Sequence, residues 1–130
     1  MIVSFPFQRG RLILPPVTLE GLYQVEPAMA LDTGALRTII TPQLAQEVGI
    51  EKNLRAGEVQ LIGGAGSAWA GAAVVKRISI LGLAVDNVEV VCHPLSPRLG
   101  LDGILGLNFL QHFNLFIHQD TETVSLEKIG

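Results

Sequence analysis

Apolar residues along this chain occur in short runs that glycine and proline interrupt. Valine, isoleucine and leucine dominate these runs, and only 5% of the residues are aromatic. Short runs of β-branched residues between turn formers are typical of strands. The pattern therefore predicts a mostly β fold. The expected strands cover residues 2–7, 11–14, 17–19, 28–31, 115–118 and 123–126, with two further strands around a glycine-containing turn within residues 78–92.

Two short helices are expected among these strands. Thr41 can cap the first helix, Pro42 suits its first position and Gly49 suits its end, so the helix is predicted over residues 41–49 as a lid on the sheet. The second is predicted over residues 107–112, where apolar side chains can cover one side of a turn or two.

The sequence contains no repeat and no linker. We therefore expect a single domain over residues 1–130. Pro15 and Pro16 lack a backbone donor, so the chain around them is expected at a sheet edge or in a kink.

Composition narrows the range of partners. The chain has 130 residues, of which 48% are hydrophobic, enough for one core. Nine Lys and Arg against 12 Asp and Glu are spread along the chain, and no segment approaches the roughly 20 apolar residues of a membrane span. We expect neither nucleic acid nor a membrane as partner. Because Cys92 is the single cysteine and the N-terminus lacks a secretory pattern, a cytoplasmic location is expected.

The segment with the most informative chemistry is Asp32-Thr33-Gly34, at the end of an apolar run. An ionised carboxylate in such surroundings needs hydrogen-bond partners or a shifted pKa, and Thr33 and Gly34 can supply a hydroxyl and a backbone N–H. A given tripeptide occurs by chance in on the order of a few per cent of chains this long. The motif therefore indicates a function only when further matching segments accompany it.

Two companion segments follow in order, and together the three resemble the retroviral-type, retropepsin-like aspartic proteases. Residues 61–67 (LIGGAGS) are similar to the glycine-rich tip of the family's flap hairpin. Residues 102–110 (DGILGLNFL) are similar to its second signature, two apolar residues and a glycine before a short helix. The resemblance implies an all-β fold, a closed β-barrel that forms half of an acid protease, with one or two short helices.

The resemblance also implies an aspartic endopeptidase with Asp32 as its catalytic residue. Two carboxyls that share one proton can activate water and deliver a proton to the peptide. The chain contains one Asp-Thr-Gly, so the second carboxylate must come from another copy across a two-fold axis. In the family, Thr33 would clasp its symmetry mate and Gly34 would leave room for a peptide or protein substrate. The resemblance implies no metal and no organic cofactor.

Flap and cleft residues follow from the same alignment of motifs. Glycines at a hairpin tip tolerate positive φ, and such a tip can close over a ligand, where the Ala65 N–H would reach the peptide through a water. The expected flap residues are Ile62, Gly63, Gly64, Ala65 and Gly66. The expected apolar lining of the cleft, which favours hydrophobic substrate side chains, comprises Ala30, Ala35, Ile39, Ile62, Leu101 and Ile104.

The sequence departs from the retroviral pattern near both signatures. Retroviral enzymes pair an aspartate after the motif with an arginine after the second glycine, whereas this chain has Leu36 and Leu107. The chain also continues for a hairpin's length beyond the second expected helix. We therefore expect the catalytic pairing to be kept and the dimer interface to differ.

Other interpretations of these residues remain open. Asp32 is compatible with a simple turn cap, and Asp102 with a solvated turn residue. Cys92 and the histidines lack the spacing of a zinc site or a Cys-His protease. The principal alternative function is a dimeric peptide-binding or assembly module that cleaves little, and a weaker one is a monomeric domain that awaits fusion to a partner half.

Overall fold

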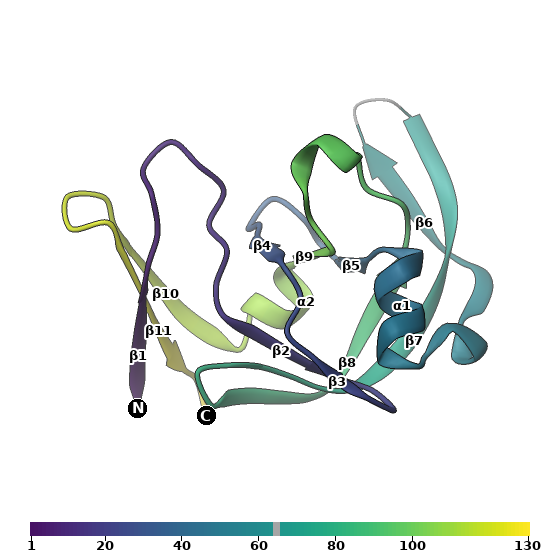
Figure 1. Ribbon diagram of the computed structural model, residues 1–130, viewed down its shortest axis with the longest axis horizontal. Helices are drawn as coiled ribbons and strands as arrows, with labels where there is room; N and C mark the ends of the chain where they lie inside the picture. The colour runs from purple at the N-terminus through teal and green to yellow at the C-terminus, as the bar shows by residue number, and fades with distance from the viewer. Residues whose placement is uncertain (64–65) are drawn as a thin grey trace.

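The structure is a computed structural model that describes residues 1–63 and 66–130 (Figure 1). Its strands are β1 (Ile2–Pro6), β2 (Val17–Glu20), β3 (Gln24–Val25), β4 (Met29–Leu31), β5 (Thr38–Ile40), β6 (Arg55–Gly63), β7 (Gly66–Ile80), β8 (Leu83–Cys92), β9 (Gly103–Leu105), β10 (Phe113–His118) and β11 (Thr123–Lys128). Its helices are α1 (Pro42–Val48) and α2 (Leu107–Leu110), with short 3-10 turns η1 (Glu51–Asn53) and η2 (Pro97–Leu99). The expectation of a mostly β fold with two short helices is confirmed.

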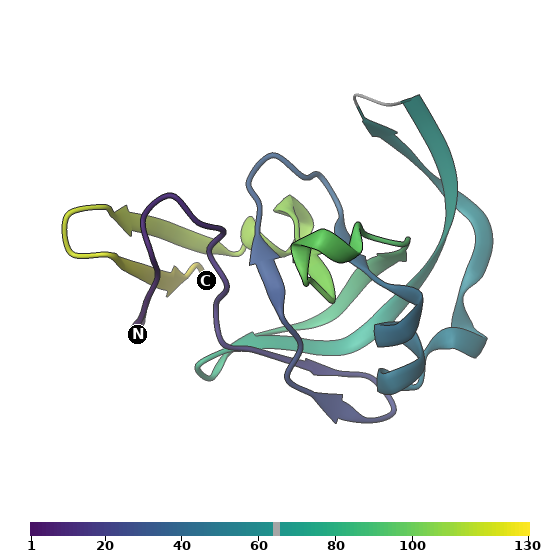
Figure 2. The same ribbon diagram turned by 45° about the horizontal axis from the view of Figure 1, so that its top comes forward.

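The strands form two sheets. The smaller sheet has the order β1-β11-β10 and is antiparallel throughout. The larger has the order β3-β2-β7-β8-β5-β9-β4, with β6 paired to β7 beside this path. In Figures 1 and 2 the small sheet lies at one end of the molecule and the β6–β7 strands rise at the other, with the larger sheet curled between them.

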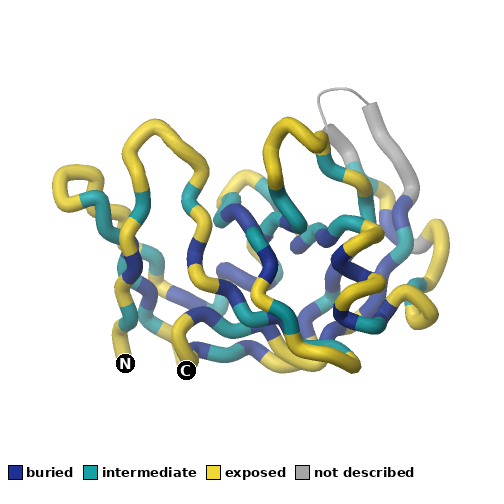
Figure 3. Tube along the Cα trace, viewed as in Figure 1, coloured by how far each residue is buried: buried dark blue, intermediate teal, exposed yellow. Residues whose placement is uncertain are grey.

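One large apolar core joins both sheets. Its members include Leu126 of the small sheet, Leu19 and Ile78 of the larger sheet, and Leu44 of α1, each no more than 1% exposed. Figure 3 shows buried stretches in the strands of both sheets. The rings of Phe109 in α2 and Phe113 in β10 lie 5.0 Å apart, centroid to centroid, so they pack the second signature against the small sheet.

Helix α1 has the ends that the sequence predicts. The Leu44 N–H donates to Thr41 Oγ1 at 3.2 Å, Pro42 occupies the first helical position, and Gly49 ends the helix with φ +80°. Leu44, Ala45 and Val48 turn one face into the core. Helix α2 ends at Leu110, earlier than the predicted residue 112.

The strand predicted over residues 11–14 is wrong. This segment is irregular, Leu12 and Leu14 are about half exposed, and Pro15 and Pro16 follow it without backbone donors. Its contact with the larger sheet includes a hydrogen bond from the Leu31 N–H to the Ile13 carbonyl at 2.9 Å. The segment therefore runs beside the sheet without joining its ladder.

Strand β7 is much longer than the predicted run. It extends over Gly66–Ile80 and pairs with β8 from Gly71↔Cys92 to Ile80↔Leu83. Ala72 and Ala73 have little intrinsic preference for strands, yet both are buried. Pairing with β8 and burial therefore form this part of the strand. None of the helices within residues 1–63 and 66–130 combines the length and apolar character needed to cross a bilayer.

Candidate active site

Two sheet pairings bring the first and second signatures together. Strand β9 pairs in parallel with β4, where Leu31 faces Leu105, and antiparallel with β5, where Ile39 faces Ile104. The loop that leaves β4 and returns as β5 therefore spans the end of β9. The Asp32 N–H donates to the Leu105 carbonyl at 3.1 Å, which places the start of the motif beside the second signature.

The motif itself is a tight turn at the end of β4. The Gly34 N–H donates to Asp32 Oδ1 at 2.9 Å, and the Ala35 N–H donates to the Asp32 carbonyl at 3.2 Å. Asp32 is half-buried, whereas Thr33 and Gly34 are exposed. The turn interpretation of the motif is thus correct locally, but it leaves Asp32 Oδ2 without a protein partner in the described part of the chain.

A pocket of about 500 Å³ lies beside this carboxylate. Residues of the loop after β4 and of strand β6 form its walls, and in Figures 1 and 2 this loop and the β6–β7 strands project toward the same side of the molecule. The lining residues are Asp32, Gly34, Ala35, Leu36, Arg37, Ile39, Gln60, Leu61 and Ile104. Asp32 is the single acid among them.

The pocket includes part of the predicted cleft. Ala35, Ile39 and Ile104 line it together with Asp32. Ala30 is instead buried beneath the sheet surface, 3% exposed, and Leu101 is half-buried outside this lining.

The predicted flap is described in part. The strands of the hairpin pair as far as Ile62↔Ser67 and Gly63↔Gly66. Gly64, Ala65 and the side chain of Ile62 lie outside the described residues. Of the predicted flap residues, the ladder therefore describes the backbone of Ile62, Gly63 and Gly66.

A partly buried hydrogen-bond network lies next to the loop between β4 and β5. Thr38, fully buried, donates its hydroxyl to Asn108 Oδ1 at 2.7 Å and accepts the Gly106 N–H at 3.1 Å. The Thr38 N–H also donates to Asn108 Oδ1 at 2.8 Å, and Asn108 Nδ2 donates to the Glu89 carbonyl at 2.7 Å. The network ties β5, α2 and β8 together. Sequence reasoning missed it, although a threonine at the start of an apolar strand is a signal of a buried hydroxyl that needs partners.

Asp102 has a structural role. Its Oδ2 accepts the Ala28 N–H at 2.8 Å, and its backbone carbonyl accepts the Thr41 N–H at 2.9 Å. Asp102 is half-buried. Asp102, which was expected to be a solvated turn residue, therefore connects two segments. It accepts backbone hydrogen bonds from Ala28, just before β4, and from Thr41, the cap of α1.

Other catalytic chemistries find little support in these geometries. Burial raises the pKa of the Cys92 thiol, which disfavours the reactive thiolate. The neighbouring His93 pairs through Nδ1 with the Pro94 carbonyl at 2.8 Å. Within residues 1–63 and 66–130 no group of three or more His, Cys, Asp or Glu side chains is arranged to hold a metal ion.

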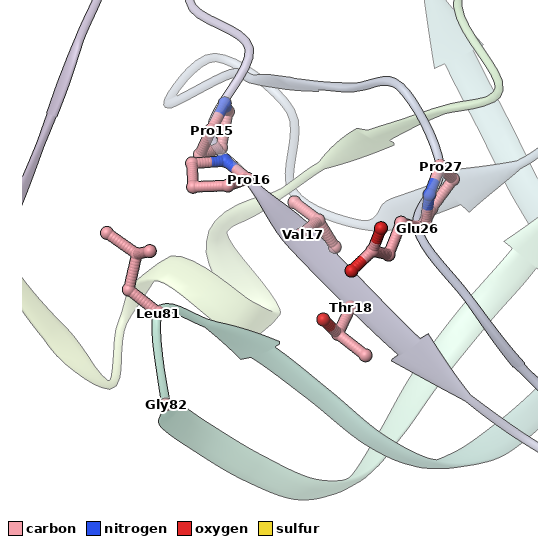
Figure 4. Close-up of a pocket in the computed structure, with 8 residues that line it drawn as sticks. All are labelled: Pro15, Pro16, Val17, Thr18, Glu26, Pro27, Leu81 and Gly82. Atoms are coloured by element: carbon pink, nitrogen blue, oxygen red, sulfur yellow. The ribbon is translucent and has the colours of Figure 1, made fainter.

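A second hollow lies away from Asp32. This hollow of about 300 Å³, drawn in Figure 4, is lined by Pro15, Pro16, Val17, Thr18, Glu26, Pro27, Leu81 and Gly82. Glu26 is the one carboxylate in this lining, and it is exposed. It has no second acid or base with which to share a proton.

Comparison with known protein families agrees with the site geometry. The family model described as "gag-polyprotein putative aspartyl protease" matches residues 17–112, a range that contains the Asp-Thr-Gly motif, the glycine-rich segment and the second signature. The chain belongs to this aspartyl protease family. A search of curated protein sequences finds no match to it.

Solved structures show the same fold in this aspartyl protease family member. The crystal structure of a retropepsin-like aspartic protease from Rickettsia conorii is similar with a TM-score of 0.73 at 18% identity, over 97% of this chain and 90% of that one. The retroviral protease-like domain of Ddi1 from Leishmania major is similar with a TM-score of 0.60 at 14% identity, over 94% of this chain and 97% of that one. The expected retropepsin-like fold is confirmed.

Backbone hydrogen bonds connect the loop between β4 and β5 to α2 in this retropepsin-like chain. The Leu107 N–H donates to the Ala35 carbonyl at 2.8 Å, and the Asn108 N–H donates to the Leu36 carbonyl at 3.3 Å. The Leu36 side chain is 74% exposed. Peptide groups therefore connect the segments that the retroviral pattern would join with an aspartate and an arginine.

Proposed function

We propose that this chain is an aspartic endopeptidase that acts as a homodimer on peptide or protein substrates. The observation that carries the proposal is the pocket of about 500 Å³ at the meeting point of both family signatures, where Asp32 is the single acid among the described lining residues. Water activation needs an acid and a base together, so one more carboxyl must reach the pocket. The exposed Thr33 and Gly34 beside Asp32 leave this face accessible to a second copy.

In the proposed dimer two Asp32 carboxyls share one proton. Loss of the second proton would place two negative charges side by side, so one group is ionised while the other keeps the proton. The ionised group takes a proton from water, and the resulting oxygen nucleophile attacks the peptide carbonyl. The protonated group then supplies a proton as the departing nitrogen leaves.

The shape of the pocket fits an extended peptide. Ala35, Ile39 and Leu61 supply apolar surface from both walls, which favours hydrophobic side chains beside the cut bond. We assign residues 62–66 as the flap that covers the peptide, with the Ala65 N–H directed to it through a water. Cys92 is free in the structure, which fits a reducing compartment such as the cytoplasm.

The alternative is a dimeric module that binds peptides and cleaves few of them. The chain is structurally similar to the retroviral protease-like domain of Ddi1, and a shared fold does not by itself imply catalytic turnover. We therefore keep the binding module as a second candidate. The two functions differ in whether bound peptides become products.

Asp32→Asn tests the proposal. The substitution removes the proton-accepting carboxylate with little change of shape, so cleavage of a diverse peptide mixture is expected to fall at least about a hundredfold. Mass spectrometry of the mixture over a pH series measures the products. Asp120→Asn, the same chemical change in the exposed turn between β10 and β11, is the control and should cleave like the parent.

Equal cleavage by the parent and Asp32→Asn would refute the proposed chemistry. Peptides that both proteins bind but neither converts to products would instead establish the binding module. A statine-type inhibitor, which imitates the tetrahedral intermediate, should suppress cleavage by the parent.

A further inference from the structure

We propose that Arg37 makes this site selective for peptides that carry an acidic side chain near the cut bond. The inference rests on the proposed function, because it places an extended peptide in the pocket beside Asp32. It adds a substrate class to that function: peptides with apolar residues at the centre and aspartate or glutamate next to them.

Arg37 is the cationic residue among the described lining of the pocket. The other described lining side chains are the carboxylate of Asp32, the amide of Gln60 and a set of apolar groups. A ligand carboxylate is repelled by Asp32 and attracted by Arg37. A lysine or arginine on the ligand would be repelled by Arg37, so the charge of this one side chain discriminates between peptides.

Glu89 holds Arg37 in place. Arg37 Nη1 donates to Glu89 Oε1 at 2.7 Å, and the Arg37 side chain remains 49% exposed. The backbone of Glu89 is itself tied down, because its carbonyl accepts Asn108 Nδ2 at 2.7 Å. The guanidinium is therefore attached to a fixed point of β8 and is not a freely moving surface charge.

The anchored guanidinium keeps capacity for a ligand. A guanidinium has five N–H donors in a planar fork, and the contact with Glu89 occupies Nη1. Within the described residues the other Arg37 nitrogens have no protein partner. A second carboxylate can therefore bind Arg37 without displacing the first.

The test compares glutamate with glutamine, which has the same shape and no charge. Acetylated, amidated octapeptides with two central leucines carry glutamate at one position at a time, and each has a glutamine counterpart. Their binding to the Asp32→Asn protein is measured by fluorescence anisotropy, so no peptide is consumed. At one or more positions glutamate should bind about two- to fivefold more tightly, the strength of a partly exposed ion pair, and added salt should reduce this ratio.

Variants of Arg37 link the preference to this side chain. Arg37→Gln should remove the difference between glutamate and glutamine, Arg37→Lys should retain part of it, and Arg37→Glu should reverse it in favour of the glutamine peptides. Arg77→Gln is the matched control, because Arg77 is an exposed arginine of β7 outside the pocket lining, and it should keep the full ratio.

The outcomes separate this inference from the proposed function. A ratio near one at every position, a ratio that survives in Arg37→Gln, or no binding of any peptide would overturn the inference. Tighter binding of peptides with a free C-terminal acid, with no effect of glutamate, would also overturn it, since the carboxylate would then come from the chain end. A clear glutamate preference without cleavage by the parent would uphold the inference and refute the endopeptidase.

Discussion

Gly106 allows two backbone segments near Asp32, the end of β9 and the start of β5, to pass very close to each other. A Cβ built on Gly106 would lie 2.3 Å from the Arg37 carbonyl oxygen and 2.4 Å from its carbon. The neighbouring Gly103 is similar, with a Cβ position 2.5 Å from the Ile39 carbonyl oxygen. These contacts are with backbone atoms, which cannot turn aside as a side chain can. The glycine of the second signature is therefore required by close packing of two segments.

Gly106→Ala should lower the free energy of unfolding by about 3 kcal/mol, because the added methyl forces β9 and β5 apart. Gly71→Ala is the matched control: its Cβ would lie 3.5 Å from Leu54 Cβ, an ordinary contact, so the change should stay below about 1 kcal/mol. Urea unfolding of both proteins gives the comparison. Similar losses for the two variants would contradict the close crossing seen at Gly106.

At the scale of elements, the β7–β8 hairpin is a long antiparallel ladder in which two opposite charges face each other. Arg77 and Asp86 face each other in the register, and Arg77 Nε donates to Asp86 Oδ1 at 2.6 Å. This hydrogen bond from Arg77 is the main reason that the pKa of Asp86 is lowered. Both side chains are exposed, so we expect the ion pair to contribute only a small part of the stability of the hairpin.

The pair should contribute stability that depends on pH. Because the folded-state pKa of Asp86 is lowered, its contribution is present above the unfolded value of about 3.9 and is lost as pH falls through the folded value. Asp86→Asn should therefore be less stable than the parent at neutral pH, with the difference disappearing in acid. Thermal unfolding across a pH series measures it. In an Arg77→Gln background the effect of Asp86→Asn should become much smaller, with Lys128 and Lys76 as the remaining nearby cations, and an undiminished effect would show that Arg77 is not its main source.

At the scale of the whole molecule, one chain holds one half of the proposed site. Among the lining residues that the structure describes, Asp32 is the single acid, and the exposed Thr33 lies next to it. The small sheet β1-β11-β10 includes a C-terminal hairpin that extends the chain beyond α2. We therefore retain the prediction that a second copy completes the catalytic pair through an interface unlike the retroviral one.

Mixing experiments should reveal this dependence. A fourfold excess of Asp32→Asn protein, equilibrated with the parent, leaves about a fifth of parent chains with an intact partner, so activity per parent chain should fall to about that fraction. The same excess of Asp120→Asn should not lower it. Dilution of the parent should also reduce its specific activity as dimers dissociate. Activity per parent chain that is unaffected by Asp32→Asn would mean that one chain suffices.

The sequence by itself determined the features that depend on residues close together in the chain. Helix α1 was predictable because its cap, Thr41, bonds to Leu44 three residues on. The turn at Asp32 was predictable in the same way, since Gly34 bonds to the carboxylate two residues away. The order of the three family segments then indicated the fold, which the comparisons confirmed.

Only the tertiary structure decided which distant residues meet. Thr38 and Asn108 are 70 positions apart, and Arg37 and Glu89 are 52 apart, so no local pattern records their contacts. Residues 11–14 look like a strand, but the neighbouring ladder leaves them outside it. Strand pairing and close backbone packing bring segments together that are far apart in the sequence. The pocket, its charged lining residues and the hydrogen bonds beside it form only when these segments are in contact.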